Sequence, residues 1–266
     1  MLGKSAYISK IAAEVERGLK TYARYGAWLA SDVIQWPFWT VFFFLSIMMY
    51  SPDLLSSKPL INILTWSFFA FVFVSSFLWA ASSVVMEVQQ GIIEQLILAK
   101  TSLRLHLVGR TVITVLDILV GGVILLLLSS LIFGAELTIT HPTLFIASTA
   151  IAFVFFLSFT SVLTALLIAV RSPWVVVSIL QFIIPFSSGG IPVQLLPPEA
   201  ARIVLLSPFF YVIHPIVASA SNSFYIPAEN LIAASAGLTV VMFFASIYIE
   251  RKLINRTLKK GKFTVF

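Results

Sequence analysis

Six stretches of the sequence are apolar over most or all of the length needed to cross a lipid bilayer. They cover residues 33–50, 60–86, 105–133, 143–170, 174–187 and 229–249. A crossing takes roughly 20 predominantly apolar residues, and backbone groups in lipid must be bonded internally, which favours helices. Because 59% of the chain is hydrophobic and only 11% is charged, we expect an all-α integral membrane protein. Residues 1–266 would form a single transmembrane domain.

The positive charges are divided unevenly between the segments that connect these stretches. Of the 17 Lys and Arg residues, only Lys58 and Arg202 lie outside the N-terminal segment, 87–110, 171–173 and the C-terminal segment. Loops rich in Lys and Arg stay in the cytoplasm. We therefore expect six spans in a cell (plasma or inner) membrane, with both termini and a basic tail at 250–266 in the cytoplasm. This distribution favours contact with membrane lipids over binding of nucleic acid.

The N-terminal segment, residues 1–30, is amphipathic rather than uniformly apolar. Ile8, Ile11, Val15 and Leu19 recur at helical spacing, while basic residues occupy the other faces. This pattern predicts a helix lying in the cytoplasmic interface of the membrane. A helix that packs against a partner protein is the alternative.

The fifth apolar stretch is short and ends at residues that break helices. About 14 apolar residues would span roughly 21 Å, and Gly189, Gly190 and Pro192 follow them. Further prolines, Pro197 and Pro208, divide the next segment into short helices. Irregular backbone at membrane depth must be covered by protein or line a cavity. We expect residues 187–226 to form a re-entrant helical hairpin between helices 5 and 6.

The sequence offers little catalytic chemistry. It has no cysteine, and His106, His141 and His214 lie near different predicted helix boundaries without metal-ligand spacing. We interpret them as boundary residues and expect no catalytic residue and no metal site. No phosphate-binding loop of the G-x-x-x-x-G-K-[ST] type occurs, so we do not expect this chain to bind ATP in that way.

Asp117 is a carboxylate well inside the third apolar stretch. An ionisable residue at that depth is a functional hypothesis by default. It would be either a structural partner within the bundle or part of a transport pathway. An ion-coupled secondary transporter usually needs several such groups or matched broken helices, so this class and that of an intramembrane enzyme remain remote alternatives.

The cytoplasmic segment at 87–104 is longer than a turn between two helices requires. Connections in helical bundles usually take 2–8 residues, and this one places Ile92, Ile93 and Ile97 at helical spacing. A plain loop is one interpretation. A short transverse helix pressed against a cytosolic subunit explains the apolar face.

Two motifs resemble those of a known family. The pattern Glu-x-x-x-Gly-x-x-Glu-x-Leu at Glu87, Gly91, Glu94 and Leu96 resembles the coupling-helix region of permeases of type-2 ATP-binding cassette exporters. The late segment is similar to the extracellular re-entrant helices of that family through Gly189, Gly190, Pro192, Pro197, Pro208 and Tyr211.

The resemblance implies a transport subunit rather than an enzyme. It implies that ATP and Mg are bound by two cytosolic ATPase partners, and that a second permease copy or a related permease completes the complex. Residues 187–226 would form the gate, and coupling to the ATPases would use Glu87, Gly91, Ile92, Ile93, Glu94, Leu96 and Ile97. The expected cargo is an amphipathic or hydrophobic, drug- or lipid-like molecule, and a lipid-linked polysaccharide is the alternative.

Overall fold

The computed structural model describes residues 4–24, 26–50, 57–90, 103–170 and 173–259, which form helices joined by turns, without a β-strand. In chain order the helices and helical turns are α1 (Lys4–Arg24), α2 (Gly26–Tyr50), α3 (Lys58–Gln89), α5 (Leu103–Phe133), α6 (Pro142–Ala169), α7 (Pro173–Pro185), η2 (Phe186–Gly190), η3 (Val193–Leu195), α8 (Pro198–Leu205), α9 (Pro208–Ser221) and α10 (Ala228–Lys259). The expected all-helical fold is therefore present.

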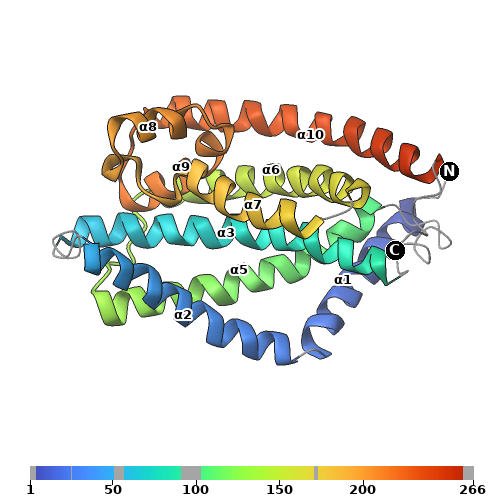
Figure 1. Cartoon of the computed structure of the whole chain (residues 1–266), viewed down its shortest axis with the longest axis horizontal. Coiled ribbons are helices and arrows are strands. Elements are labelled where there is room, and N and C mark those ends of the chain that lie inside the picture. The colour runs from blue at the N-terminus through green and yellow to red at the C-terminus, as the bar shows by residue number, and fades with distance from the viewer. Residues whose placement is uncertain (1–3, 25, 51–56, 91–102, 171–172, 260–266) are drawn as a thin grey trace.

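Helix α3 forms the centre of the bundle. It runs along the molecule with α2 and α5 on one side and α6, α7, α9 and α10 on the other (Figure 1). Phenylalanine side chains provide much of its packing: the ring centroids of Phe73 and Phe77 lie 6.0 Å and 5.8 Å from that of Phe156 on α6. Aromatic pairs at these separations stabilise a core beyond the area that they bury.

Five helical segments are long and apolar enough to cross a membrane: Lys58–Glu87, Leu105–Phe133, Pro142–Ile168, Pro173–Gly190 and Ala228–Leu253. The bent pair α8 and α9 would make a sixth. The first predicted span lies in α2, whose apolar part, Ile34–Met49, is shorter. These helices have the length and composition of those in integral membrane proteins. Which segments make up the six spans stays a prediction.

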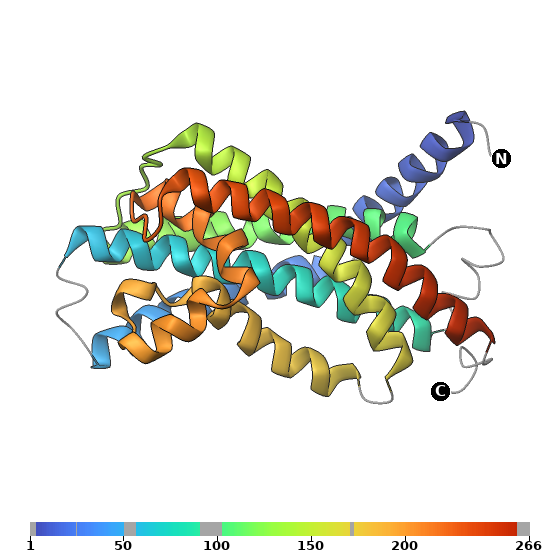
Figure 2. The same cartoon turned by 90° about the horizontal axis from the view of Figure 1, so that it is seen from above.

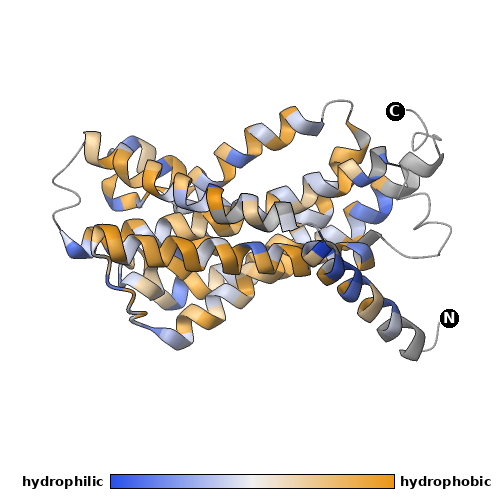
Figure 3. Ribbon diagram, turned by 90° about the horizontal axis from the view of Figure 1, so that it is seen from below, coloured by the Kyte–Doolittle hydropathy of each residue, from blue (hydrophilic) through white to orange (hydrophobic). Residues whose placement is uncertain are grey.

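The start of α1 and the end of α10 lie at the same end of the bundle, where α3 finishes and α5 begins (Figures 1 and 2). We name this the basic end. Of the described Lys and Arg residues, only Lys58 and Arg202 lie at the opposite end. Lys58 pairs there with Glu136 at 3.0 Å. Hydrophobic residues cover the length of the bundle, whereas hydrophilic ones gather on α1 (Figure 3).

The fifth predicted span is longer than the sequence indicates. Instead of breaking at 187, the helix continues through η2, so the apolar segment Pro173–Gly190 has 18 residues and a length of roughly 27 Å. Within this turn, Ser187 and Ser188 donate hydrogen bonds to the carbonyls of Ile184 and Pro185, at 3.1 Å and 2.8 Å, so both hydroxyls are bonded inside the helix. The helix ends at Gly189, whose φ of 91° favours glycine. The expectation of a helix too short to cross was therefore wrong.

Helix α9 reverses the direction of the chain within the bundle. Phe209, near its start, packs against Phe155 and Phe159, which lie midway along α6. Near its end, the carbonyl of Ser219 accepts a 2.9 Å hydrogen bond from the amide of His141, just before α6 begins. Helix α9 thus starts inside the bundle and returns to the end opposite the basic end, where α10 starts (Figure 2).

Candidate functional site

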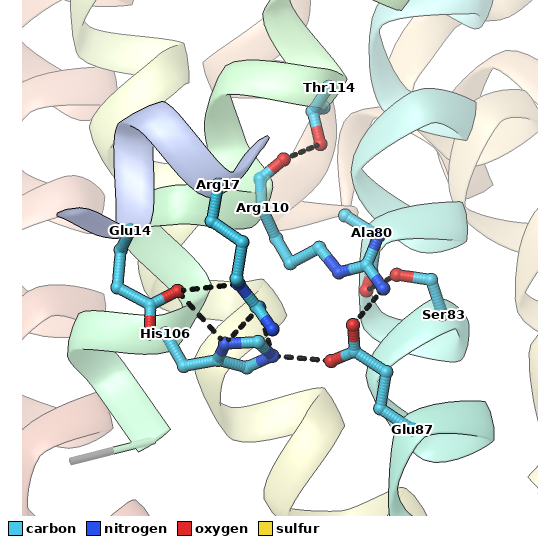
Figure 4. A network of polar contacts seen from close by, with 8 residues as sticks. All are labelled: Glu14, Arg17, Ala80, Ser83, Glu87, His106, Arg110 and Thr114. Carbon is cyan, nitrogen blue, oxygen red and sulfur yellow. Dashed lines mark hydrogen bonds and ion pairs between the residues drawn. The ribbon is translucent and has the colours of Figure 1, made fainter. Parts of the chain in front are cut away.

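Five charged or titratable side chains from three helices meet inside the basic end (Figure 4). Helix α1 contributes Glu14 and Arg17, α3 contributes Glu87, and α5 contributes His106 and Arg110. Glu14, Glu87 and His106 are buried, and Arg17 and Arg110 are partly buried. We call this set the ionic network. Such groups are costly to bury unless each is paired and hydrogen-bonded.

His106 is the centre of the network and is fully buried. Its Nε2 contacts Glu87 Oε2, and its Nδ1 lies 3.3 Å from Glu14 Oε2 and 2.7 Å from Arg17 Nη2. Nε2–H donates to Glu87. In the neutral ring Nδ1 accepts a hydrogen bond from Arg17, whereas in the protonated ring Nδ1–H donates to Glu14. The contact with Arg17 is therefore a hydrogen bond only when the imidazole is neutral, and the contact with Glu14 is one only when it is protonated.

Each carboxylate of the network also has a guanidinium partner. Arg110 Nη2 donates to Glu87 Oε1, and Arg17 Nε lies 3.2 Å from Glu14 Oε2. Burial raises the pKa of the Glu14 carboxyl, but the hydrogen bond from His106 and the positive charge of Arg17 outweigh this effect and hold its pKa below the usual 4.5. Apart from the imidazole, the charges of the two carboxylates and two guanidiniums balance.

Two glycines bring α1 close enough to α5 for these contacts to form. A Cβ at Gly18 would lie 2.6 Å from the carbonyl oxygen of Gly109, and a Cβ at Gly109 would lie 2.7 Å from that of Glu14. Small residues at a crossing allow helix backbones to approach this closely. Gly18 and Gly109 therefore set the separation at which Arg17 and Glu14 reach His106.

A cavity of about 300 Å³ lies beside the network, between α1, α2, α3 and α5. Arg110 lines it and is shared with the network, and Asp117 lines it two turns further along α5. Ser76 Oγ donates a 2.5 Å hydrogen bond to Asp117 Oδ2, and Trp36 Nε1 donates a 3.4 Å one to Oδ1. We call this cavity the Asp117 pocket.

The structure brings together only some of the residues predicted to be functional. Glu87 is in the ionic network, and Asp117 lines the pocket. The remaining predicted coupling residues, Gly91, Ile92, Ile93, Glu94, Leu96 and Ile97, lie outside the described residues.

The predicted gate residues gather around α9, away from the ionic network. Gly189, Gly190 and Pro192 are buried at the end of η2 and just after it. Pro208 begins α9, where Tyr211 packs against Phe210 with ring centroids 5.5 Å apart. Exposed Pro197 directly precedes α8.

Sequence reasoning missed four of the five network residues. His106 lies at the start of the third apolar stretch, as expected, but the interpretation as a boundary residue gave it no partner. The available signal was spacing: Glu14 and Arg17 are three residues apart, and His106 and Arg110 are four apart. Each pair therefore lies on one helix face, but spacing alone does not indicate that the two faces meet.

The chain matches no protein-family model and no curated protein. Among the described residues, no group of three or more His, Asp or Glu side chains is arranged to hold a metal ion. The fold and the two sites define a helical protein of the membrane class with an ionic network and a small pocket at one end.

Proposed function

We propose that this chain is the permease subunit of an ATP-driven exporter that moves an amphipathic or hydrophobic, drug- or lipid-like molecule out of the cytoplasm or the inner leaflet. The observation that carries the proposal is the position of Glu87. It starts the predicted coupling pattern, and its carboxylate lies between His106 and Arg110 of α5. A partner pressing on residues 91–102 would act directly on the two helices that this carboxylate joins.

The ionic network supports a route for such a movement into the bundle. The last turn of α3 is tied to α5 through Glu87, and α5 is tied to α1 through His106 and Glu14. Buried pairs resist separation because removing one partner leaves an uncompensated charge. The three helices would therefore move together, and Arg110 would carry the movement to the wall of the Asp117 pocket.

The arrangement at the opposite end suits a gate. Helix α9 begins inside the bundle and returns to that end, and α8 meets it at an angle of 103°. In the proposed topology α7 with η2 is the fifth span, 187–226 is re-entrant, and α10 is the sixth. The basic end would face the cytoplasm, where two ATPase subunits binding ATP and Mg would dock, and a second permease would complete the complex.

The coupling assignment is tested by reversing a charge in the predicted coupling segment. The full chain is purified with its co-purifying ATPase and reconstituted in vesicles, and ATP hydrolysis and ATP-dependent movement of a lipophilic fluorescent dye are measured together. We expect Glu94→Lys to abolish dye movement while hydrolysis continues. The matched control is Glu136→Lys at the opposite end, which should retain both. Undiminished dye movement in Glu94→Lys, or absence of any co-purifying ATPase, would contradict the proposal.

The orientation is tested separately, because the chain has no cysteine of its own. Single cysteines replace Leu195, Ser223 and Leu258 in turn, and intact cells are treated with an impermeant thiol reagent. The first two should be labelled from outside and the third only after the membrane is opened. The reverse pattern would overturn the proposed topology.

A further inference from the structure

The Asp117 pocket contains a carboxylate without a counterion among the described residues. Two neutral groups donate to Asp117, the hydroxyl of Ser76 and the indole N–H of Trp36, and no described Lys, Arg or His forms an ion pair with it. An ionised carboxylate has about four lone-pair positions, so these donors leave acceptor positions unused. A buried charge without a partner is unfavourable, so a carboxylate at this position either takes up a proton or attracts an external cation.

The pocket walls suit an organic cation better than a metal ion. The aromatic side chains Tyr22, Trp36 and Trp79 contribute to them, together with Ala80, Met86 and Ile113. Aromatic faces attract substituted ammonium groups. Ca²⁺ takes about six to eight oxygen ligands and Mg²⁺ a near-ideal octahedral set, whereas Asp117 is the one carboxylate among the described residues that line this pocket.

The neighbouring guanidinium does not turn the pocket into an anion site. Arg110 also lines the cavity, but its Nη2 donates to Glu87 in the ionic network. Its charge is therefore already compensated, whereas that of Asp117 is not. The electrostatics at the Asp117 side of the pocket favour a cation.

Local packing holds the carboxylate and its aromatic neighbour in place. Gly121 lies one helical turn beyond Asp117, and a Cβ there would lie 2.7 Å from the indole of Trp36. The missing side chain lets this indole lie against α5 with its N–H directed at Asp117 (3.4 Å). Trp79 is 50% exposed, so the pocket has an aromatic side chain at its open edge.

We propose that the Asp117 pocket binds the substituted ammonium group of an amphipathic cation. Asp117 supplies the charge, Trp36 and Trp79 supply aromatic contact, and Ser76 keeps the carboxylate oriented. The volume of about 300 Å³ is at the lower end for ligand sites, so it accepts a headgroup and one ring. The ammonium group can belong to a free molecule or to a lipid headgroup.

The test measures binding of radiolabelled phenyltrimethylammonium to the full chain in nanodiscs of phosphatidylglycerol, with binding to empty discs subtracted. We expect saturable binding, at least tenfold weaker in Asp117→Asn and lost in Ala80→Phe, which fills the pocket without touching the carboxylate. Glu229→Gln removes one exposed carboxylate elsewhere and should bind as the parent does. Circular dichroism and gel filtration of each variant show that it is folded.

Two further experiments, one with a neutral competitor and one with other lipids, identify what the pocket recognises. Unlabelled tert-butylbenzene has the shape of the probe without its charge and should not compete. Discs of phosphatidylethanolamine or phosphatidylcholine should weaken probe binding if a lipid headgroup is the occupant and leave it unchanged if the occupant is a free molecule. Equal binding by parent and Asp117→Asn, or competition by tert-butylbenzene, would overturn the proposal. The assay uses neither ATP nor an ATPase, so its failure would leave the proposed exporter function untouched.

Discussion

Helix α5 carries ionisable side chains at two levels, and the two levels are built differently. At the first, His106 and Arg110 meet carboxylates from α1 and α3, so that each charge in the ionic network has an oppositely charged partner. At the second, the described residues give Asp117 only the neutral donors Ser76 and Trp36. Buried ion pairs make a junction that depends on all of its members. A carboxylate bonded only to neutral groups instead keeps the capacity to attract a cation.

The largest effect is expected from removing the carboxylate that joins α3 to α5. Glu87→Ala leaves both His106 and Arg110 without their acidic partner, and breaking a buried pair in this way costs about 3–5 kcal/mol. Unfolding in detergent, followed by circular dichroism, measures the loss. The matched control is Glu136→Ala, which breaks the exposed pair with Lys58 and should cost about 0–1 kcal/mol. Similar losses in the two variants would erase the distinction between a buried junction and a surface pair.

A smaller effect is expected from pushing α1 away from α5. In Gly18→Ala the new methyl group would meet the Gly109 carbonyl at 2.6 Å, an overpacking that costs about 1–3 kcal/mol. Trypsin should then cleave α1 faster, since the helix no longer packs closely on α5. Gly237→Ala is the control, because a Cβ there meets nothing within 4 Å and alanine is favoured within a helix. Unchanged cleavage in Gly18→Ala would show that the glycine contact does not hold α1.

Lowering the pH should weaken the packing of α1 against α5, because it protonates Glu14. Its pKa in the folded protein is held below 4.5, so its contribution to stability is fully present above that value and is lost as the pH falls through the lowered pKa. Tryptic cleavage is impractical in acid, so we propose to follow a fluorescence pair between labelled cysteines on α1 and α5 as the pH is lowered. Glu14→Gln should remove this part of the acid response. An identical pH profile in the parent and in Glu14→Gln would assign the response to another group.

The smallest effect on stability is expected from substituting Asp117, the ionisable residue at the second level of α5. Asp117→Asn keeps the size of the side chain: its amide oxygen can accept from Trp36, and its NH2 group can donate to the Ser76 hydroxyl. The substitution also removes a charge that has no counterion among the described residues. We expect the free energy of unfolding to change by less than about 1 kcal/mol, or to rise. The measurement is the same detergent unfolding used for Glu87→Ala. A loss as large as in that variant would make Asp117 a structural partner rather than a site for ligands.

The sequence predicted the features that depend on runs of residues. The helical class follows from hydropathy, and α1 follows from its spacing of apolar residues. The sequence also predicted that the fifth apolar helix ends at Gly189 and Gly190. Each of these depends on neighbours in the chain, and local patterns encode them.

What the sequence did not predict depends on contacts between distant segments. Glu14 and His106 are 92 residues apart, and nothing in either segment indicates that Gly18 and Gly109 will meet. The extra turn after α7 contains Ser187 and Ser188, whose hydroxyls are bonded to the carbonyls of Ile184 and Pro185, and a count of apolar residues overlooks it. Asp117 was singled out for its depth, but its pocket needed Trp36 from α2 and Ser76 from α3.

The balance of charge at the two levels has an electrical consequence. Moving one elementary charge through a membrane potential of 100 mV takes about 2.3 kcal/mol. With a neutral His106, the ionic network has no net charge, so α1, α3 and α5 can shift as a block with little electrical work. An ionised Asp117 does have a net charge, and a bound ammonium group cancels it. The voltage across the membrane would therefore exert a force on the Asp117 region of α5 when the pocket is empty and no net force when an ammonium group fills it.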